Sequence, residues 1–198
     1  MLRLIVGLGN PGLKYEKTRH NAGFVFLEEL ASRHGCQWAL ETRFQGLLSQ
    51  FEFQGNKLIL LKPQTFMNLS GVSVSSVMNY YKLTANELLV VHDELDLPEG
   101  VLRFKKNGGH AGHNGIRDIM SHIATRDFCR LRVGIGRPAI GMEVTGYVLG
   151  SATSAARQAM VCEINRVCDH FEIVLQGDVE RLNGILADAV KNISLDKK

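Results

Sequence analysis

The side chains that could carry acid–base chemistry are His20 and Asp93. His20 lies in a polar loop just before a helical pattern, where an isolated histidine is more often a surface or capping residue. Asp93 follows His92 at the end of a short apolar strand, and ligands collect at the carboxyl ends of strands in α/β sheets. A carboxylate there can orient an imidazole base, although it can equally cap a turn.

Three asparagines could complete such a site. Asn10, Asn68 and Asn114 all lie in loops beside glycines or helix starts. Each of them alone is more often a turn former or an N-cap. Taken together with His20 and Asp93, they predict a histidine base that activates water while amide groups position a polar substrate and polarise a carbonyl. This chemistry needs neither a metal nor a covalent intermediate, and the chain has no GxSxG motif for a serine nucleophile.

Two motifs point to other chemistries. The run Gly7-Leu8-Gly9-Asn10-Pro11-Gly12 matches the dinucleotide pattern GxGxxG, but Pro11 removes one backbone donor and a polar stretch precedes the next helix. A tight turn without a ligand is the alternative. The HxxH at His110–His113 could be half of a metal site completed by His92, Asp93 or His20, although its glycine surroundings favour a loop over a rigid ligand cage.

The hydrophobic pattern predicts strands that alternate with helices. Strands are expected at 2–6, 47–53, 57–61, 88–91, 101–106 and 128–135; the pair at 47–61 forms a hairpin. Helices are expected from 21 to about 35, around 74–81 and 116–123, and over most of the last quarter. Loops at 64–71, 92–98 and 107–115 carry most of the candidate residues. We therefore expect one α/β domain over residues 1–198, a twisted mixed sheet with helices packed around it.

Composition excludes several classes of protein. Apolar residues make up 45% of the 198 residues and charged residues 22%, as in ordinary soluble domains. The apolar runs are too short for a membrane span or a secretory signal, so we expect no membrane partner. The four cysteines have no CxxC or zinc spacing. Free thiols in a reducing, cytoplasmic setting are expected.

The net charge of +3 conceals an uneven distribution. Residues 86–100 carry five acidic and no basic side chains, whereas residues 101–137 carry eight basic and two acidic ones. Half of the 20 glycines lie between Gly100 and Gly150. Such asymmetry suggests a bound polyanion, although a solvated basic face is the more frequent cause of a single run.

Five separated runs resemble those of bacterial-type peptidyl-tRNA hydrolases, in the same order and spacing. They are Val6–Gly12, Thr18–Gly23, Phe66–Gly71, His92–Pro98 and Gly112–Gly115. The likeness extends from residue 2 to about 150 and is weaker in the helical tail. Asn107 and Ala111 stand where some members of the family have glycine, which bears on the flexibility of that loop.

The resemblance implies a monomeric esterase, without metal or cofactor, that cleaves the bond between a peptide and the 3′ end of its tRNA. It would thereby recycle tRNA from peptidyl-tRNA released from or stalled on ribosomes. By position, His20 matches the general base, Asp93 the residue that orients it, and Asn10 the residue that helps to distinguish N-blocked from free aminoacyl-tRNA. The remaining matches are to substrate-binding positions, at Tyr15, Phe66, Asn68 and Asn114, with Met67 and His113 lining the same cleft.

A tRNA substrate gives the basic segment a role. We expect four residues on strands that flank the Asn114 loop to contact phosphates of the acceptor stem: Arg103, Lys105, Arg130 and Arg132. The low aromatic content, 7%, argues against a base-stacking platform. Two alternatives stay open, a non-catalytic RNA-binding protein on the same fold and a metal-dependent phosphoesterase.

Overall fold

A computed structural model describes residues 1–195 and the side chains of residues 1–187. Its centre is a seven-stranded sheet in the order β2-β3-β4-β1-β5-β7-β6. The strands are β1 (Leu4–Gly7), β2 (Ala39–Glu41), β3 (Gly46–Phe53), β4 (Asn56–Pro63), β5 (Leu88–Glu94), β6 (Leu102–Lys106) and β7 (Cys129–Gly134). The four central strands, β4, β1, β5 and β7, run parallel, while β3, β2 and β6 pair antiparallel at the two sides. The predicted α/β class with a mixed sheet is confirmed.

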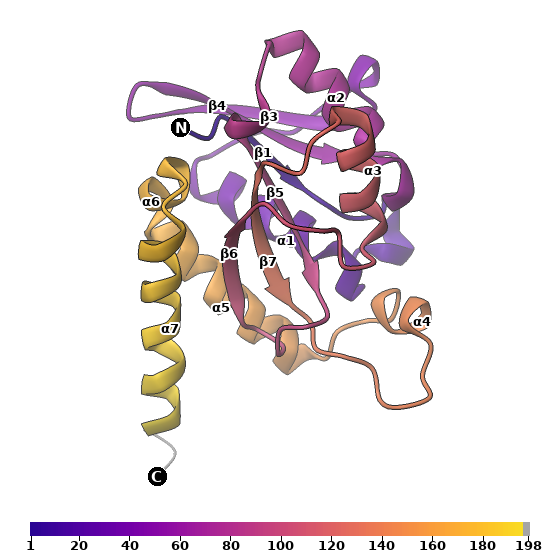
Figure 1. Ribbon diagram of the computed structural model, residues 1–198, viewed down its shortest axis with the longest axis vertical. Coiled ribbons are helices and arrows are strands. Elements are labelled where there is room, and N and C mark those ends of the chain that lie inside the picture. Colours follow the sequence, from indigo (N-terminus) through magenta and orange to yellow (C-terminus); the bar gives the residue numbers. More distant parts are fainter. Residues whose placement is uncertain (196–198) are drawn as a thin grey trace.

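Helices cover both faces of this sheet (Figure 1). They are α1 (Ala22–Arg33), α2 (Ser70–Tyr81), α3 (Asn114–Ile123), α4 (Val144–Val148), α5 (Ser154–Asp169), α6 (Phe171–Gln176) and α7 (Val179–Leu195). Side chains of β1 alternate between two cores: Ile5 packs with residues of α1, α5, α6 and α7, whereas Leu4 and Val6 pack with residues of α2 and α3. This double coverage is why Leu4, Ile5 and Val6 of β1 are all apolar.

The predicted elements occur in the structure in the predicted order, with several differences. The helix α4 was not predicted, and α2 and α3 begin at Ser70 and Asn114, within segments expected to be loops. The short outer strand β2 was not predicted. The strand predicted over 88–91 continues through His92, Asp93 and Glu94, which the sequence pattern assigns to a loop. This assignment was wrong because Asp93 and Glu94 pair with Val133 and Gly134 of β7, and tertiary pairing outweighs their low strand propensity. The hairpin turn consists of Gln54 and Gly55, both with positive φ, as a two-residue turn between twisted strands requires.

The glycines of the GxGxxG run allow close packing of α1 on β1. A Cβ atom at Gly7 would lie 2.2 Å from the carbonyl oxygen of Gly23, and one at Gly9 would lie 2.7 Å from the ring of Phe24. Short 3₁₀ segments at 13–15 and at 19–21 separate the run from α1. The helix therefore does not begin at the glycines, as the dinucleotide fingerprint requires.

The strand β6 lies at one end of the sheet, and α7 packs alongside it (Figure 1). The side-chain amide of Asn183 on α7 bonds to the backbone of Phe104: its Oδ1 accepts from the N–H at 2.8 Å and its Nδ2 donates to the C=O at 2.8 Å. Within the described residues, no helix has the length and apolar character needed to cross a membrane.

Candidate active site

The carboxyl ends of the central parallel strands bring together three side chains that are distant in the sequence. Asp93 is the penultimate residue of β5, and His20 is in the 3₁₀ segment at 19–21 directly before α1. His113 is the N-cap of α3. Because α1 and α3 cover opposite faces of the sheet, their first residues meet at this edge on either side of β5.

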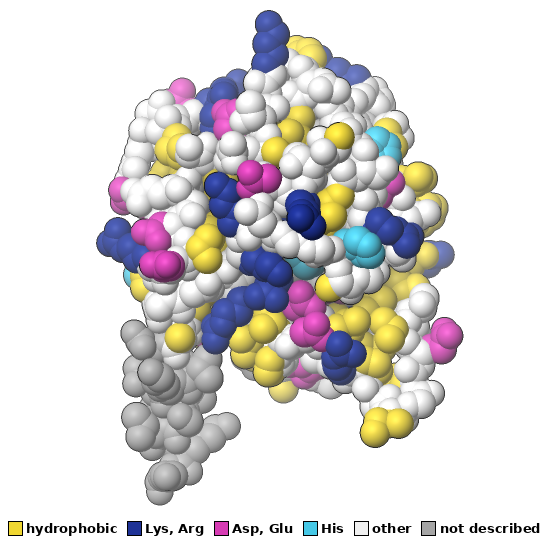
Figure 2. Space-filling view, viewed as in Figure 1, with side chains coloured by type: hydrophobic (Ala, Val, Ile, Leu, Met, Phe, Trp, Pro, Cys, Tyr) yellow, Lys and Arg dark blue, Asp and Glu magenta, His cyan; other side chains and the backbone are white. Residues whose placement is uncertain are grey.

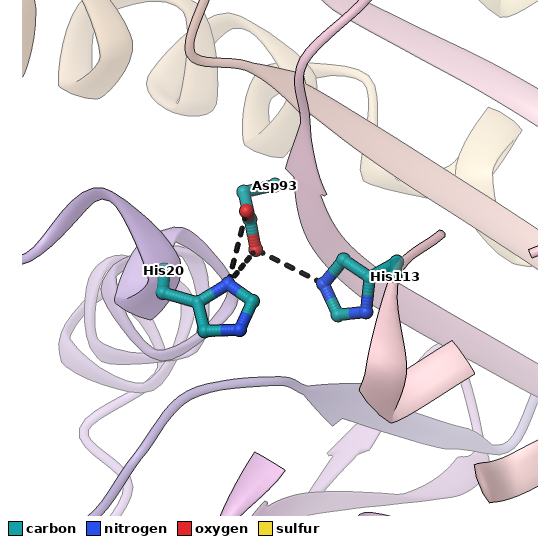
Figure 3. A group of neighbouring side chains, drawn as sticks. All are labelled: His20, Asp93 and His113. Atoms are coloured by element: carbon teal, nitrogen blue, oxygen red, sulfur yellow. Dashed lines mark hydrogen bonds and ion pairs between the residues drawn. The ribbon is translucent and has the colours of Figure 1, made fainter. Parts of the chain in front are cut away.

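Both imidazoles bond to the same carboxylate (Figure 3). His20 Nδ1 lies 2.9 Å from Asp93 Oδ1 and 3.0 Å from Oδ2, and His113 Nε2 lies 3.0 Å from Oδ1. The side chains are 12% (His20), 3% (Asp93) and 8% (His113) exposed. Burial by itself would raise the pKa of Asp93, but the two imidazoles hold that pKa well below its usual range. Asp93 is therefore an ionised acceptor.

The carboxylate determines which ring nitrogen carries the proton. Since ionised Asp93 can only accept, His20 donates through Nδ1–H and His113 through Nε2–H. The Nδ1 atom of His113 accepts from the N–H of Ile116 at 3.3 Å, as an N-cap does. The Nε2 atom of His20 then carries the free lone pair, has no hydrogen bond to a described residue, and is available to take a proton.

His92 packs against His113, one of these three side chains. Its Nδ1–H donates to the carbonyl oxygen of Asp93 at 2.7 Å, and its ring stands edge-on to that of His113 at 4.9 Å between centroids. Burial, with a further contribution from His113, lowers the pKa of His92 to about 3. His92 is thus a neutral side chain beneath the site.

Because His92 is buried and neutral, we expect the folded chain to lose stability in acid. The unfolded chain protonates this residue near pH 6.5 and the folded chain only near pH 3. Its contribution to stability is therefore complete above pH 6.5 and is lost as the pH falls through that window, by on the order of 3 kcal/mol at pH 4. Urea unfolding between pH 7 and 4 should show a shallower decline for His92→Asn, whose amide can keep the bond to the Asp93 carbonyl. Parallel declines would contradict this assignment. Asp93, whose pKa is depressed below 3.8, contributes to acid lability only at lower pH.

Asn10 is held in one orientation in the loop that follows β1. Its backbone N–H donates to Oδ1 of Asn21 at 2.8 Å, and its C=O accepts from Nδ2 of Asn21 at 3.0 Å. Its own side-chain Oδ1 accepts from the N–H of Met67 at 2.8 Å. Since the oxygen is used by Met67, the Nδ2 amide of Asn10 is the group left to donate to a ligand.

A cavity of about 690 Å³ opens over the histidines. Most of the predicted site residues line it, namely Asn10, His20, Phe66, Met67, Asn68, Asp93, His113 and Asn114. Tyr15 does not: it lies in the 3₁₀ segment at 13–15, half-buried beneath Lys14.

Sequence reasoning did not assign the rest of the lining to this site. It comprises His92, Glu94, Leu95, His110, Ala111, Gly112, Arg117, Arg137, Val144, Thr145, Val148 and Leu149. The first three belong to the His92–Pro98 run, which the motif could have supplied. The last four come from α4 and the residue after it, whose sequence carries no pattern pointing to a site.

The four basic residues predicted to contact tRNA lie on adjacent strands, where Arg103 pairs with Arg132 and Lys105 with Arg130. Figure 2 shows Lys and Arg side chains gathered over β6 and β7. Arg130 is nevertheless buried, and its guanidinium donates to the carbonyls of residues 107, 108 and 109. A phosphate contact is therefore not its role in this structure. It holds the loop before α3, in which Asn107 and Ala111 have positive φ.

The one described group of three side chains close enough to share a metal ion is His20, Asp93 and His113, and not the HxxH pair. Their N···O distances are those of charge-assisted hydrogen bonds, so hydrogen bonding accounts for the arrangement. His110 instead accepts from the N–H of Gly112 at 3.1 Å, within its own loop.

Comparisons of the sequence and of the structure with known proteins find the same family. A family model described as peptidyl-tRNA hydrolase matches residues 4–192. The peptidyl-tRNA hydrolase of Methylococcus capsulatus is 48% identical, over 92% of this chain and 97% of that protein. The protein of the same name from Oceanobacillus iheyensis is 46% identical, over 89% and 94%. The crystal structure of the Acinetobacter baumannii peptidyl-tRNA hydrolase superimposes with a TM-score of 0.88 at 42% identity, covering 93% of this chain and 94% of that one.

Proposed function

The chain belongs to the peptidyl-tRNA hydrolase family, and on that basis we propose that it hydrolyses the ester between a peptide and the 3′ ribose of its tRNA, with His20 as general base. The observation that supports this role for His20 most directly is the pairing of its Nδ1 with buried Asp93, which leaves Nε2 free at the cavity. Such a base activates water without a covalent intermediate.

The reaction follows from this geometry in two proton transfers. His20 Nε2 removes a proton from a water molecule, whose oxygen attacks the ester carbonyl carbon. Asp93 stabilises the imidazolium that forms, because its negative charge lies 2.9 Å from Nδ1. The carbon–oxygen bond to the ribose then breaks, and the imidazolium returns the proton to the leaving 3′ oxygen. The products are the free peptide and tRNA.

The asparagines supply the polar contacts that such a substrate needs. The Nδ2 of Asn10 donates to a carbonyl of the N-blocked aminoacyl group, a group that free aminoacyl-tRNA lacks. Asn68 and Asn114 lie exposed on the same cavity and bind the substrate there, with Phe66, Met67 and His113 packing beside it. Tyr15 lies outside this cavity, so its predicted contact with the substrate stays a prediction.

Deacylation of N-acetyl-aminoacyl-tRNA tests the function. The purified protein should release the N-acetyl amino acid in the presence of EDTA and spare free aminoacyl-tRNA. Loss of activity with chelator would favour the metal-dependent alternative instead. Binding of tRNA with no turnover would favour a non-catalytic RNA-binding protein, although such a protein has no need to maintain the His20–Asp93 pair.

Arg103, Lys105 and Arg132 are proposed to hold phosphates of the acceptor stem. They lie on β6 and β7 beside the loop that leads to Asn114, and Arg132 also faces Glu94 at 3.6 Å. Because phosphate contacts release counterions, they give affinity that depends on salt and not on base sequence. We further propose that the protein acts as a cytoplasmic monomer.

Removing two of these cations should reduce the salt dependence of binding. For Arg103→Ala combined with Lys105→Ala, the slope of log K for tRNA against log[salt] should fall by about 1.4–1.8, the value for two phosphate contacts. Filter binding between 50 and 250 mM KCl measures the slope. Lys57→Ala, an exposed lysine at the start of β4, is the matched control. An unchanged slope in the double variant would show that these two residues of β6 do not contact tRNA phosphates.

A further inference from the structure

The segment that carries His20 is joined to the turn after α4. Thr18 and Ser151 form an isolated antiparallel bridge. The N–H of Arg19 donates to the carbonyl of Gly150 at 3.1 Å, and the N–H of Ala152 donates to the carbonyl of Lys17 at 3.2 Å. Residues 17 to 19, directly before the proposed catalytic base, therefore hold the turn that follows α4.

The side chain of Arg19 adds contacts from the same position. Its Nη1 donates to the carbonyl of Ser151 at 2.9 Å and lies 3.4 Å from that of Tyr147. Its guanidinium carbon lies 4.3 Å from the centroid of the Tyr147 ring, and its Nε is 3.8 Å from Oε1 of Glu99. A planar guanidinium can combine such a fork of donors with stacking on a ring, which a lysine ammonium cannot.

The helix α4 depends on contacts of this kind. It has five residues, Val144–Val148, and an isolated helix of that length is unstable in water. A further attachment is the hydroxyl of Tyr147, which donates to the carbonyl of Ile135 at 2.6 Å. Tyr147 is thus fixed at its hydroxyl by the end of β7 and at its ring and carbonyl by Arg19.

The face of α4 that these contacts hold in place is apolar. Val144, Val148 and Leu149 line the cavity over His20, together with Phe66 and Met67. Figure 2 shows hydrophobic side chains gathered around α4. An apolar wall at this position suits the side chain of an amino acid whose carbonyl is held next to the base.

We propose that Arg19 is a positioning residue that fixes α4 over the cavity, so that the apolar wall binds the side chain of the esterified amino acid. The inference rests on the proposed function. Arg19 acts through α4, and the bond from its backbone N–H to Gly150 does not need its side chain. Loss of the side chain should therefore weaken binding of substrates with large apolar residues while leaving the His20–Asp93 pair intact.

Steady-state kinetics of Arg19→Ala on two substrates test this. With N-acetyl-phenylalanyl-tRNA, KM should rise about tenfold and kcat should stay within about threefold. With N-acetyl-glycyl-tRNA, which has no side chain for the wall to bind, KM should change far less. Arg157→Ala is the matched control, because this exposed arginine lines the same small cavity as Arg19. A fall in kcat at constant KM, or equal effects on both substrates, would overturn the proposal.

Hydrogen exchange gives a readout that does not require turnover. The amides of residues 144–151 should exchange faster in Arg19→Ala than in the wild type or in Arg157→Ala. Tyr147→Ala should raise KM in the same way. The KM of the double variant should be no higher than that of the more impaired single variant, because Arg19 acts on α4 through Tyr147. Unchanged exchange would overturn the anchor itself. Absence of turnover by the wild type would instead contradict the proposed function and leave the exchange result to stand on its own.

Discussion

Replacing His20 by alanine is expected to lower kcat by at least about 10²–10⁴-fold, the range a positioned general base contributes. The imidazole is the group whose free Nε2 faces the cavity, while its Nδ1 is held by Asp93. Without it, a water molecule in the cavity must attack the ester unassisted. Deacylation of N-acetyl-aminoacyl-tRNA under saturating substrate measures the effect.

Binding of tRNA separates a chemical role for His20 from a structural one. The affinity of the His20→Ala variant for deacylated tRNA should stay within about threefold of the wild type, since phosphate contacts dominate such binding. His122→Ala is the matched control, because His122 is exposed on α3 and bonds within its own helix to Asp118. Near-normal turnover by His20→Ala would show that another group is the base.

The substitution Asp93→Asn is expected to lower kcat by about 10²–10⁴-fold for a different reason. An amide in place of the carboxylate can offer its N–H₂ to His20, which places the imidazole proton on Nε2, where it blocks proton abstraction. The neutral side chain also no longer stabilises the imidazolium. The loss should therefore appear in kcat, measured by the same deacylation assay.

The fold of this variant must be checked, because Asp93 is buried and bonded to two histidines. Circular dichroism and urea unfolding at pH 7 should show a folded chain, since asparagine has nearly the same shape and keeps one acceptor. Asp127→Asn, at an exposed position after α3, controls for the loss of one negative charge. A folded Asp93→Asn protein with wild-type kcat would mean that the carboxylate does not orient the base.

The fold could be predicted from the sequence wherever local pattern and tertiary burial agree. The apolar runs of β1 and β4 and the amphipathic pattern of α3 locate these elements within a few residues. The end of β5 could not be predicted, because His92, Asp93 and Glu94 are polar and are held in a strand by pairing with β7. Pairing between residues that are 40 positions apart leaves no local signal.

The site, too, could be predicted only in part. Residue types and resemblance pointed to His20, Asp93 and the asparagines, and the structure places these around one cavity. The partnership of His113 with the same Asp93 oxygen could not be predicted, since it depends on where α3 begins relative to β5. The burial of Arg130 could not be predicted, because a sequence shows the charge of a side chain and not its burial. Its guanidinium donates to three carbonyls of the loop before α3.

The amide of Asn183 has a consequence for the behaviour of the protein in concentrated solution. An outer strand normally presents a row of free N–H and C=O groups on which another chain can add a strand. On β6 the N–H and C=O of Phe104, in the middle of the strand, are already bonded by a side chain that imitates a neighbouring strand. At the opposite end of the sheet, β2 is only three residues long. It pairs only with Gly46, Leu47 and Leu48, so the rest of β3 lies beyond its reach. The β6 edge therefore resists edge-to-edge aggregation, because the peptide groups in the middle of this strand are already bonded.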